Sequence, residues 1–372
     1  MTTSPPLPRW ADIFILPLLN LLAAFFVCGL IILALGENPI TALVVMIKGA
    51  FVYPGSLGYT LYYTTNFIFT GLAVAVAFHA MMFNIGGEGQ AYLGGLGCGL
   101  ISLWLAPTMP AILVLPLAVI AAAIFGAVWG FIPGYLYAKR GSHIVITTIM
   151  FNFIASAIMV WLLAGPLIEA GRQSPQTPEF APTGQLPKFS TMFDQLGSAV
   201  ANSPLNLSFV IALLALVAVW FLIWKTRFGY SVRAIGHNPE AAHYAGINVP
   251  VVIMLTLAIS GGLAGLMATN EILGVQHRVV LNFTSGYGFT GIAVALMGRN
   301  HPVGIFMASL LFGALYQGGA ELDFEFESIT REMVLLIQGM IILFSGALAY
   351  MFNPPLARFI ARFITARRAA NV

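Results

Sequence analysis

Long apolar runs separated by short polar breaks dominate the chain. A helix needs roughly 20 mainly apolar residues to cross about 30 Å of hydrocarbon. The pattern therefore predicts an all-α, polytopic membrane helix bundle with about ten transmembrane segments. We expect these segments at 13–35, 60–83, 89–106, 111–138, 143–165, 206–224, 249–270, 286–298, 302–319 and 333–352.

Three further features divide the chain into parts. Residues 38–52 are amphipathic and are expected to lie along the membrane interface. Residues 286–298 are too few for an upright crossing, which predicts a half-helix or a re-entrant element. The proline-rich stretch 166–205 predicts a small extramembrane cap. The expected organisation is one transmembrane domain over 1–352, with the cap at 166–205, a polar loop at 225–248 and a basic tail at 353–372.

Basic residues predict the orientation of the bundle, because cytoplasmic loops are enriched in lysine and arginine. With ten spans, both termini lie on the same side. Placing them in the cytoplasm leaves eleven basic residues inside and five outside, and the opposite orientation reverses this split. The five outside are Lys48, Arg172, Lys188, Arg278 and Arg331.

Composition excludes several classes of protein. With 59% hydrophobic and 8% charged residues, the chain cannot present a water-facing globular surface. Cys28 and Cys98 both lie in apolar runs, so neither a disulfide framework nor a metal site is predicted. No HExxH or GxSxG motif indicates an enzyme. Nucleic-acid binding has no support beyond the arginines of the tail, which the orientation explains.

The polar loop contains the sequence RFGYSVRAIGHNPEAAHYAGI at 227–247, which predicts a short helix. Asn238 suits the N-cap, Pro239 the first turn and Glu240 the positive end of the helix dipole. Gly246 suits the helix stop. The small residues after Glu240 would allow close approach to a groove in a partner protein. The alternative is an ordinary basic loop.

Four segments, in the same order, resemble permeases of ABC importers of the nucleoside and simple-sugar type. They are MFNIGGEGQAYLGG (82–95), TTIMFNFIA (147–155), RAIGHNPEAAHYAGI (233–247) and GYGFTGIAVALMGRNHPVG (286–304). In that family the loop carries the coupling helix, which contacts a cytoplasmic ATPase and has an EAA---G pattern. The residues that the resemblance assigns to coupling are Arg233, Asn238, Pro239, Glu240, Ala241, Ala242 and Gly246.

The resemblance implies a subunit that does not hydrolyse ATP itself. The sequence agrees, because a P-loop needs GxxxxGK[ST] and none of the four lysines follows a glycine. ATP and Mg²⁺ would therefore bind a separate ATPase, and this chain is expected to hold no cofactor. The other implied partners are a second permease subunit in a heterodimer, an extracytoplasmic solute-binding protein and the lipids of the bacterial cytoplasmic (inner) membrane.

The cargo predicted by the resemblance is a nucleoside, because FNIGGEGQ (83–90) is most similar to permeases that work with nucleoside-binding lipoproteins. A simple sugar is the alternative within the family. Outside it, an ion-coupled secondary transporter would normally need several ionisable groups inside the spans, and Glu88 and His79 are the candidates. A non-transporting membrane scaffold that binds partners through 227–247 is the third possibility.

Candidate pathway residues come first from the glycine-rich stretch 83–90. Clustered glycines break a helix, and a carboxylate inside a bilayer costs on the order of 3 kcal/mol. One interpretation is a broken helix lining the pathway, with Asn84, Glu88 and Gln90 as contacts. The other is a solvated cytoplasmic turn. LNFTSGYGFTG at 281–291 echoes this stretch in its asparagine and glycines, a hint of a two-half repeat.

Two more spans carry polar residues at helical spacing. Tyr62 and Asn66 share one face and could line the pathway, although tyrosines near a span end also fit an interfacial aromatic belt. Thr148 and Asn152 likewise share a face, where they would contact solute or bond helices together. Pairs of glycines at GxxxG spacing, such as Gly126/Gly130 and Gly261/Gly265, predict close helix packing.

Overall fold

The computed structural model of the 372-residue chain describes residue 11 and residues 15–195, 201–344 and 356–357. These residues form helices and loops, with isolated β-bridges at Gln176–Val280 and Lys188–Asn206 and no strands. The chain divides into two compact units, residues 1–49 with 318–372 and residues 50–317. The expected tail at 353–372 and the end of the last predicted span lie almost entirely outside the described residues.

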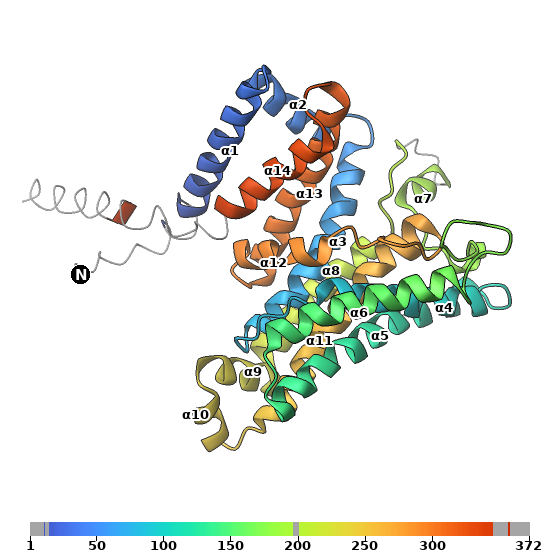
Figure 1. The fold of residues 1–372 in the computed structure, drawn as a ribbon, viewed down its shortest axis with the longest axis vertical. Helices are drawn as coiled ribbons and strands as arrows, with labels where there is room; N and C mark the ends of the chain where they lie inside the picture. The colour runs from blue at the N-terminus through green and yellow to red at the C-terminus, as the bar shows by residue number, and fades with distance from the viewer. Residues whose placement is uncertain (1–10, 12–14, 196–200, 345–355, 358–372) are drawn as a thin grey trace, which may run out of the picture. The chain divides into compact units, whose positions relative to one another are not determined.

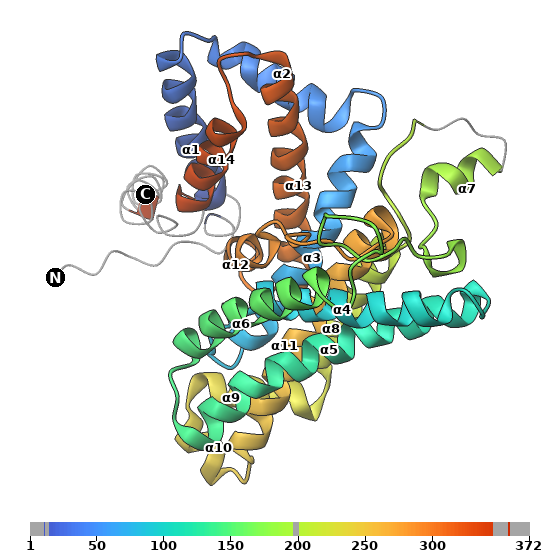
Figure 2. The ribbon, with the colours of Figure 1, turned by 45° about the vertical axis from the view of Figure 1, so that its right-hand side comes forward.

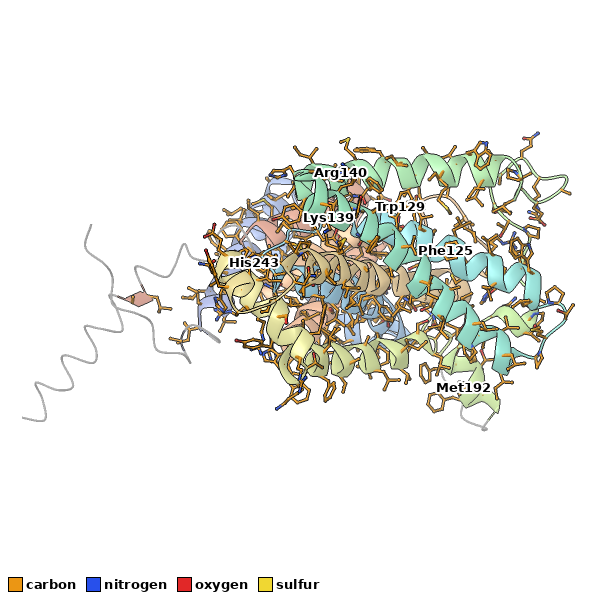
Figure 3. The ribbon with its side chains drawn as sticks, turned by 90° about the horizontal axis from the view of Figure 1, so that it is seen from below. Phe125, Trp129, Lys139, Arg140, Met192 and His243 are labelled. Atoms are coloured by element: carbon orange, nitrogen blue, oxygen red, sulfur yellow. The ribbon has the colours of Figure 1, made fainter. Side chains whose placement is uncertain are left out.

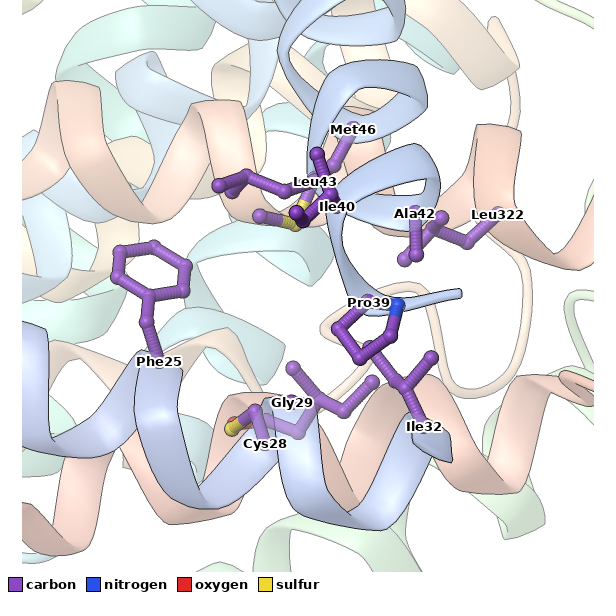
Figure 4. Close-up of a pocket in the computed structure, with 11 residues that line it drawn as sticks. Phe25, Cys28, Gly29, Ile32, Pro39, Ile40, Ala42, Leu43, Met46 and Leu322 are labelled. Carbon is purple, nitrogen blue, oxygen red and sulfur yellow. The ribbon is translucent and has the colours of Figure 1, made fainter. Parts of the chain in front are cut away.

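The first unit is built from α1 (Leu16–Ala34), most of α2 (Pro39–Phe51), the end of α13 (Pro302–Glu325) and α14 (Arg331–Ile342). The α1–α2 pair bends by 116° at the break between the two helices. An apolar pocket of about 160 Å³ lies inside this unit (Figure 4). Its walls are aliphatic and aromatic side chains with the Cys28 thiol, so it offers little to a polar solute.

The second unit contains the remaining helices. Figures 1 and 2 show α4, α5, α6 and α11 running side by side in it. Two short elements, the 3₁₀ turn Pro182–Gly184 and α7 (Phe189–Gln195), belong to the predicted cap. The long helices of this unit are α3 (Ser56–Phe78), α4 (Gly87–Leu105), α5 (Ala111–Arg140), α6 (Ile144–Ala164), α8 (Ser208–Lys225), α11 (Val249–Ala268) and the first part of α13. Its shorter helices are α9 (Arg227–His237), α10 (Pro239–Tyr244), the π-helix Thr269–Gln276 and α12 (Tyr287–Met297).

Glycines let the central helices of this unit approach closely. A Cβ atom at Gly126 or Gly130 would overlap the backbone of α11 at Gly261 or Leu257. The predicted GxxxG packing is therefore confirmed for α5 against α11. α3 lies at the centre, with every residue from Thr64 to Ala77 buried.

The cap and the polar loop lie at opposite ends of this unit. Figure 3 places Lys139, Arg140 and His243 toward one end and Met192 of α7 toward the other. Lys139 and Arg140 thus lie at the end that carries α10, away from α7. Arg172 and Lys188 belong to the cap, and Arg278 forms ion pairs with two of its glutamates. The separation of α10 from α7 is the arrangement that the charge pattern predicts for two faces of a membrane.

A helix lies at each of the ten predicted spans, but they do not all qualify as full crossings. Among the described residues, six helices are long and apolar enough to cross a membrane, or seven if the bent α1–α2 pair is one span. α4 does not qualify because its glycines and Glu88 lower its mean hydropathy. α12, with 11 residues, is short, as predicted for 286–298. The six qualifying helices span 56–78, 111–140, 144–164, 208–225, 249–276 and 302–325.

Candidate functional site

The chain between α3 and α4 turns back into the bundle before α4 begins. Asn84 and Gln90 are each only 1% exposed, so this stretch is not a solvated turn. Asn84 Nδ2 donates to Gln90 Oε1 at 3.0 Å and to Ser260 Oγ at 2.8 Å. The side-chain oxygen Asn84 Oδ1 accepts from the Gly86 amide at 2.9 Å. The asparagine therefore holds the broken end of α4 against α11.

The contacts of this segment with α5 and α11 show how far it lies from the ends of those two helices. Gln90 Nε2 is 3.3 Å from the place where a Gly130 Cβ would be. Gly130 is ten residues from Arg140 at the end of α5, or about 15 Å at 1.5 Å per residue. Ser260, which Asn84 contacts, is similarly far from the start of α11 at Val249. Gln90, in the first turn of α4, thus lies well inside the bundle, away from the ends of α5 and α11.

α6 holds the same stretch from the other side. Asn152 accepts from the Gly89 amide at 2.8 Å and donates to the Ile85 carbonyl at 2.9 Å. Thr148 bonds back to the Ile144 carbonyl and accepts from the Ile85 amide at 3.3 Å. Thr148 and Asn152 do share a face, and both bond to the segment 85–89.

Glu88 connects the two similar glycine-rich stretches, residues 83–90 and 281–291. Its Oε1 accepts from the Gly286 amide and its Oε2 from the Gly288 amide, each at 2.9 Å. These amides belong to the first turn of α12, where a carboxylate is favoured by unpaired N–H groups and the helix dipole. The broken N-terminal ends of α4 and α12 therefore meet at Glu88.

A pocket of about 340 Å³ opens beside this contact. Tyr92 forms one wall, with its hydroxyl donating to Asn282 Oδ1 at 2.8 Å. The exposed rings of Phe153 and Phe289 form others. Asn282 and Ser285 adopt left-handed backbone angles, with φ of 58° and 46°, a strained conformation for these residues that is enriched at functional sites. The pocket combines aromatic surface with amide, hydroxyl and carboxylate groups from Asn152, Asn282, Thr284, Ser285, Ser156 and Glu88.

A second carboxylate lies in the same unit and was not predicted. Glu271 sits on the π-helix and is 3% exposed. Its Oε1 accepts from the Tyr62 hydroxyl at 2.5 Å and from Asn66 Nδ2 at 2.6 Å. Asn270 extends the network, donating to Asn66 Oδ1 at 2.8 Å and accepting from Asn206 at 2.9 Å. Tyr62 and Asn66 do share a face, but that face is sealed inside the protein.

The sequence contained one signal for Glu271. The polar triplet Thr269, Asn270, Glu271 follows an apolar run, and the predicted span ended at 270. Because Tyr62 is buried, the aromatic-belt alternative is wrong for this residue, although Tyr59 is exposed.

The polar loop contains two helices, α9 and α10. α10 is the predicted short helix, whereas α9 was not predicted. Asn238 caps α10 by accepting from the Ala241 amide at 3.0 Å, and Pro239 and Glu240 occupy its first turn. Gly246 has a φ of +82°, the left-handed value typical of a helix stop. Arg233 lies on α9 and is half-buried.

The faces of α10 differ strongly in exposure. Ala242 is buried at 3% exposure by the chain itself, so a larger residue there would disturb this protein first. Ala241, Glu240 and Tyr244 are exposed, Tyr244 at 90%. Pro239 and His243 are exposed as well, so every residue of α10 except Ala242 faces outward.

Among the described residues, the six or seven helices that are long and apolar enough to cross a membrane indicate a multi-pass membrane protein. Residues 56–346 match the family described as the permease component of the branched-chain amino acid transport system, and the chain belongs to this family.

Individual relatives agree with this placement. The chain is 36% identical to the nucleoside ABC transporter permease protein NupB of Lactococcus lactis, over 89% of this chain and 90% of that one. It is 35% identical to the guanosine ABC transporter permease protein NupP of Bacillus subtilis, over 89% and 92%. It is also 34% identical to the glucose ABC transporter permease protein TsgB13 of Haloferax volcanii, over 88% and 86%. The resemblance to permeases of ABC importers is confirmed.

Proposed function

We propose that this permease imports nucleosides delivered by an extracytoplasmic solute-binding protein, with ATP hydrolysed by a separate cytoplasmic subunit. The observation that carries the proposal is the similarity over 89% of the chain to two permeases whose names specify a nucleoside or guanosine. A simple sugar is the second candidate, because the glucose permease relative is almost as similar.

The Glu88 pocket supports a solute with a ring and several polar groups. Tyr92, Phe153 and Phe289 provide aromatic surface on which a flat base can stack. Asn282 and Ser285 add groups that can bond to base edges or ribose hydroxyls. Among the predicted pathway residues, we assign Glu88 and Asn152 to the pathway, and Asn84, Gln90 and Thr148 to the support of the broken helix. We assign Tyr62 and Asn66 to the stability of the fold.

The same proposal includes the topology. We propose ten membrane segments in one transmembrane domain, with both termini and the 225–248 loop in the cytoplasm of a bacterial cell and the 166–205 cap outside. The support is the placement of the basic residues Lys139 and Arg140 with α10 at one end of the 50–317 unit and α7 at the other (Figure 3). A second permease subunit would complete the transport pathway as a heterodimer.

The exposed face of α10 is the proposed contact with the ATPase. Tyr244 is a large ring that projects from a short helix whose ends are both fixed, by the Asn238 cap and the Gly246 stop. Exposed aromatic side chains of this kind act as anchors in protein interfaces because they bury a large area at low entropic cost.

Substitution tests this contact directly. Tyr244→Ala is expected to abolish co-purification of the ATPase and to remove uptake, while the chain still inserts, because an exposed substitution usually changes stability by less than about 0.5 kcal/mol. Tyr230→Ala on α9 is the matched control, since Tyr230 is also exposed, at 62%. Normal ATPase binding by Tyr244→Ala would leave 227–247 as an ordinary basic loop.

The cargo is tested with the complete transporter in proteoliposomes. Uptake of radiolabelled guanosine, adenosine, ribose and glucose is measured with ATP enclosed on the ATPase side. Nucleoside uptake that requires both ATP and the binding protein supports the proposal, whereas uptake of sugars alone selects the second candidate. Uptake that persists without the ATPase would indicate a secondary transporter, and no uptake of any solute would favour a scaffold.

A further inference from the structure

α12 is held at both of its ends. Its first turn donates two amides to the Glu88 carboxylate beside the pocket. Its last turn leads into residues 298–301, where Arg299 and Asn300 have left-handed φ angles of 53° and 55°. Such a turn is specified by several local constraints and does not bend freely. With 11 residues, α12 spans about 16 Å between these two ends.

The second end of α12 touches the elements that lead to the coupling loop. His79 Nε2 is 3.1 Å from the Asn300 carbonyl oxygen. The Trp224 ring, at the end of α8, lies between two imidazoles, with centroids 5.1 Å from His79 and 5.1 Å from His301. The rings meet edge-on and tilted, at 88° and 57°, and we call His79, Trp224 and His301 the ring cluster.

α9 also packs against His79. Gly236, near the end of α9, lies so close to the His79 carbonyl that no side chain fits between them. α9 is joined to α8 through Thr226 and to α10 through Asn238. A displacement of α10 therefore reaches the ring cluster through α9, because short links join these helices.

α12 is also close-packed along its length. A Cβ at Gly291 would overlap Thr70, and Val294 lies 3.0 Å from the Cβ position of Gly71, both on α3. Packed interiors transmit a displacement because they have little free volume. α12 is thus a short rigid connection between the ring cluster and Glu88.

We propose that α12 transmits the movement of the coupling helices to the Glu88 pocket, and that Trp224 and His301 are positioning residues for this step. The proposal rests on the proposed function, because it assumes that α10 is moved by an ATPase. In this arrangement, a shift of α9 turns the 298–301 segment, and α12 withdraws or returns the two amides that hold Glu88. The pocket between α4, α6 and α12 then changes its accessibility with the nucleotide state.

The experiment uses the complete transporter in nanodiscs and in proteoliposomes. Ser156→Cys, on the α6 wall of the pocket, reports accessibility to a membrane-impermeant thiol reagent. Background labelling of this chain is expected to be low because its cysteines, Cys28 and Cys98, are buried, and labelling is read on the permease band alone. Labelling is compared between the nucleotide-free transporter and the transporter trapped with ATP.

Trp224→Ala is then added to the Ser156→Cys transporter. The matched control is Trp220→Ala, on the same helix and one turn away from the ring cluster. We expect Trp224→Ala to keep ATP hydrolysis within about twofold of wild type while uptake per ATP falls roughly tenfold, the range for a lost coupling residue. The labelling difference between the two nucleotide states is expected to disappear. Trp224→Phe retains a ring and is expected to restore most of the uptake per ATP and most of the labelling difference.

The outcomes separate this proposal from its alternatives. An equal loss of ATP hydrolysis and uptake, as a merely structural residue gives, contradicts it. The proposal is also contradicted if the transporter with Ser156→Cys as its single substitution is labelled equally with and without ATP. If Trp224→Ala fails to assemble, His301→Ala, at an exposed position, must give the same uncoupling. Failure of wild-type uptake for every solute refutes the proposed cargo, but the labelling still tests α12.

Discussion

Glu88 and Glu271 are both carboxylates within the helical unit 50–317, and their surroundings are opposite. Glu88 is half-buried, bonds to backbone amides of another helix and borders a pocket. Glu271 is sealed and bonds through one oxygen to the side chains of Tyr62 and Asn66. A carboxylate held by the amides of a short helix can be released when that helix moves. One enclosed by tyrosine and asparagine side chains fixes the helices in place.

The largest effect is expected at the sealed site. Glu271→Ala leaves the Tyr62 hydroxyl and the Asn66 amide buried without an acceptor, and each unsatisfied group costs about 1–3 kcal/mol. The purified permease should therefore lose several degrees of thermal stability and much of its yield. A melting curve in detergent checks this. Unchanged melting would show that the network does not hold the fold.

A smaller effect is expected at the contact between Glu88 and α12, where two neighbouring glycines provide a test. A Cβ at Gly288 would overlap the Glu88 backbone, whereas a Cβ at Gly87 would be 3.4 Å from the Gly288 carbonyl oxygen, an ordinary contact. Gly288→Ala should lower uptake strongly with the subunits still assembled, and Gly87→Ala should leave uptake near wild type. Equal uptake by both variants would mean that this approach is not needed for transport.

The smallest effect is expected at the pocket wall. Tyr92→Phe removes the hydroxyl that donates to Asn282, a partly buried bond worth about 1 kcal/mol. Uptake should fall a few-fold through a higher KM for solute-loaded binding protein, while the thermal stability stays close to wild type. A large loss of stability instead would place Tyr92 with Glu271 among the structural residues.

Local features of this fold could be predicted from the sequence. The Asn238 cap, the Gly246 stop and the break before α4 depend on residues within one or two helical turns, and all three are present. The similarity of 83–90 and 281–291 also indicated a relation between two stretches that meet at Glu88. These signals reflect backbone chemistry, which acts over short distances along the chain.

Long-range pairing could not be predicted in this way. Tyr62 and Asn66 share a face in sequence, but their partner Glu271 is more than 200 residues away. The π-helix Thr269–Gln276 changes the helical register, which an α-helical periodicity does not reveal. Ala242 belonged to the predicted coupling pattern, and only the packed structure shows that its own chain buries it.

The most direct test is the same substitution at the two carboxylates. In Glu271→Gln, the remaining oxygen can accept from both Tyr62 and Asn66, because both bonds go to one atom. In Glu88→Gln, one of the two amides of α12 faces an NH₂ group instead of an oxygen. Initial rates of ATP-dependent nucleoside uptake in proteoliposomes, at equal amounts of assembled transporter, are compared with wild type. We predict near-normal uptake for Glu271→Gln and a loss of roughly tenfold or more for Glu88→Gln, as for a lost bond to a charged group. Normal uptake by Glu88→Gln, or a loss confined to Glu271→Gln, would contradict the assignment of the pathway to the Glu88 pocket.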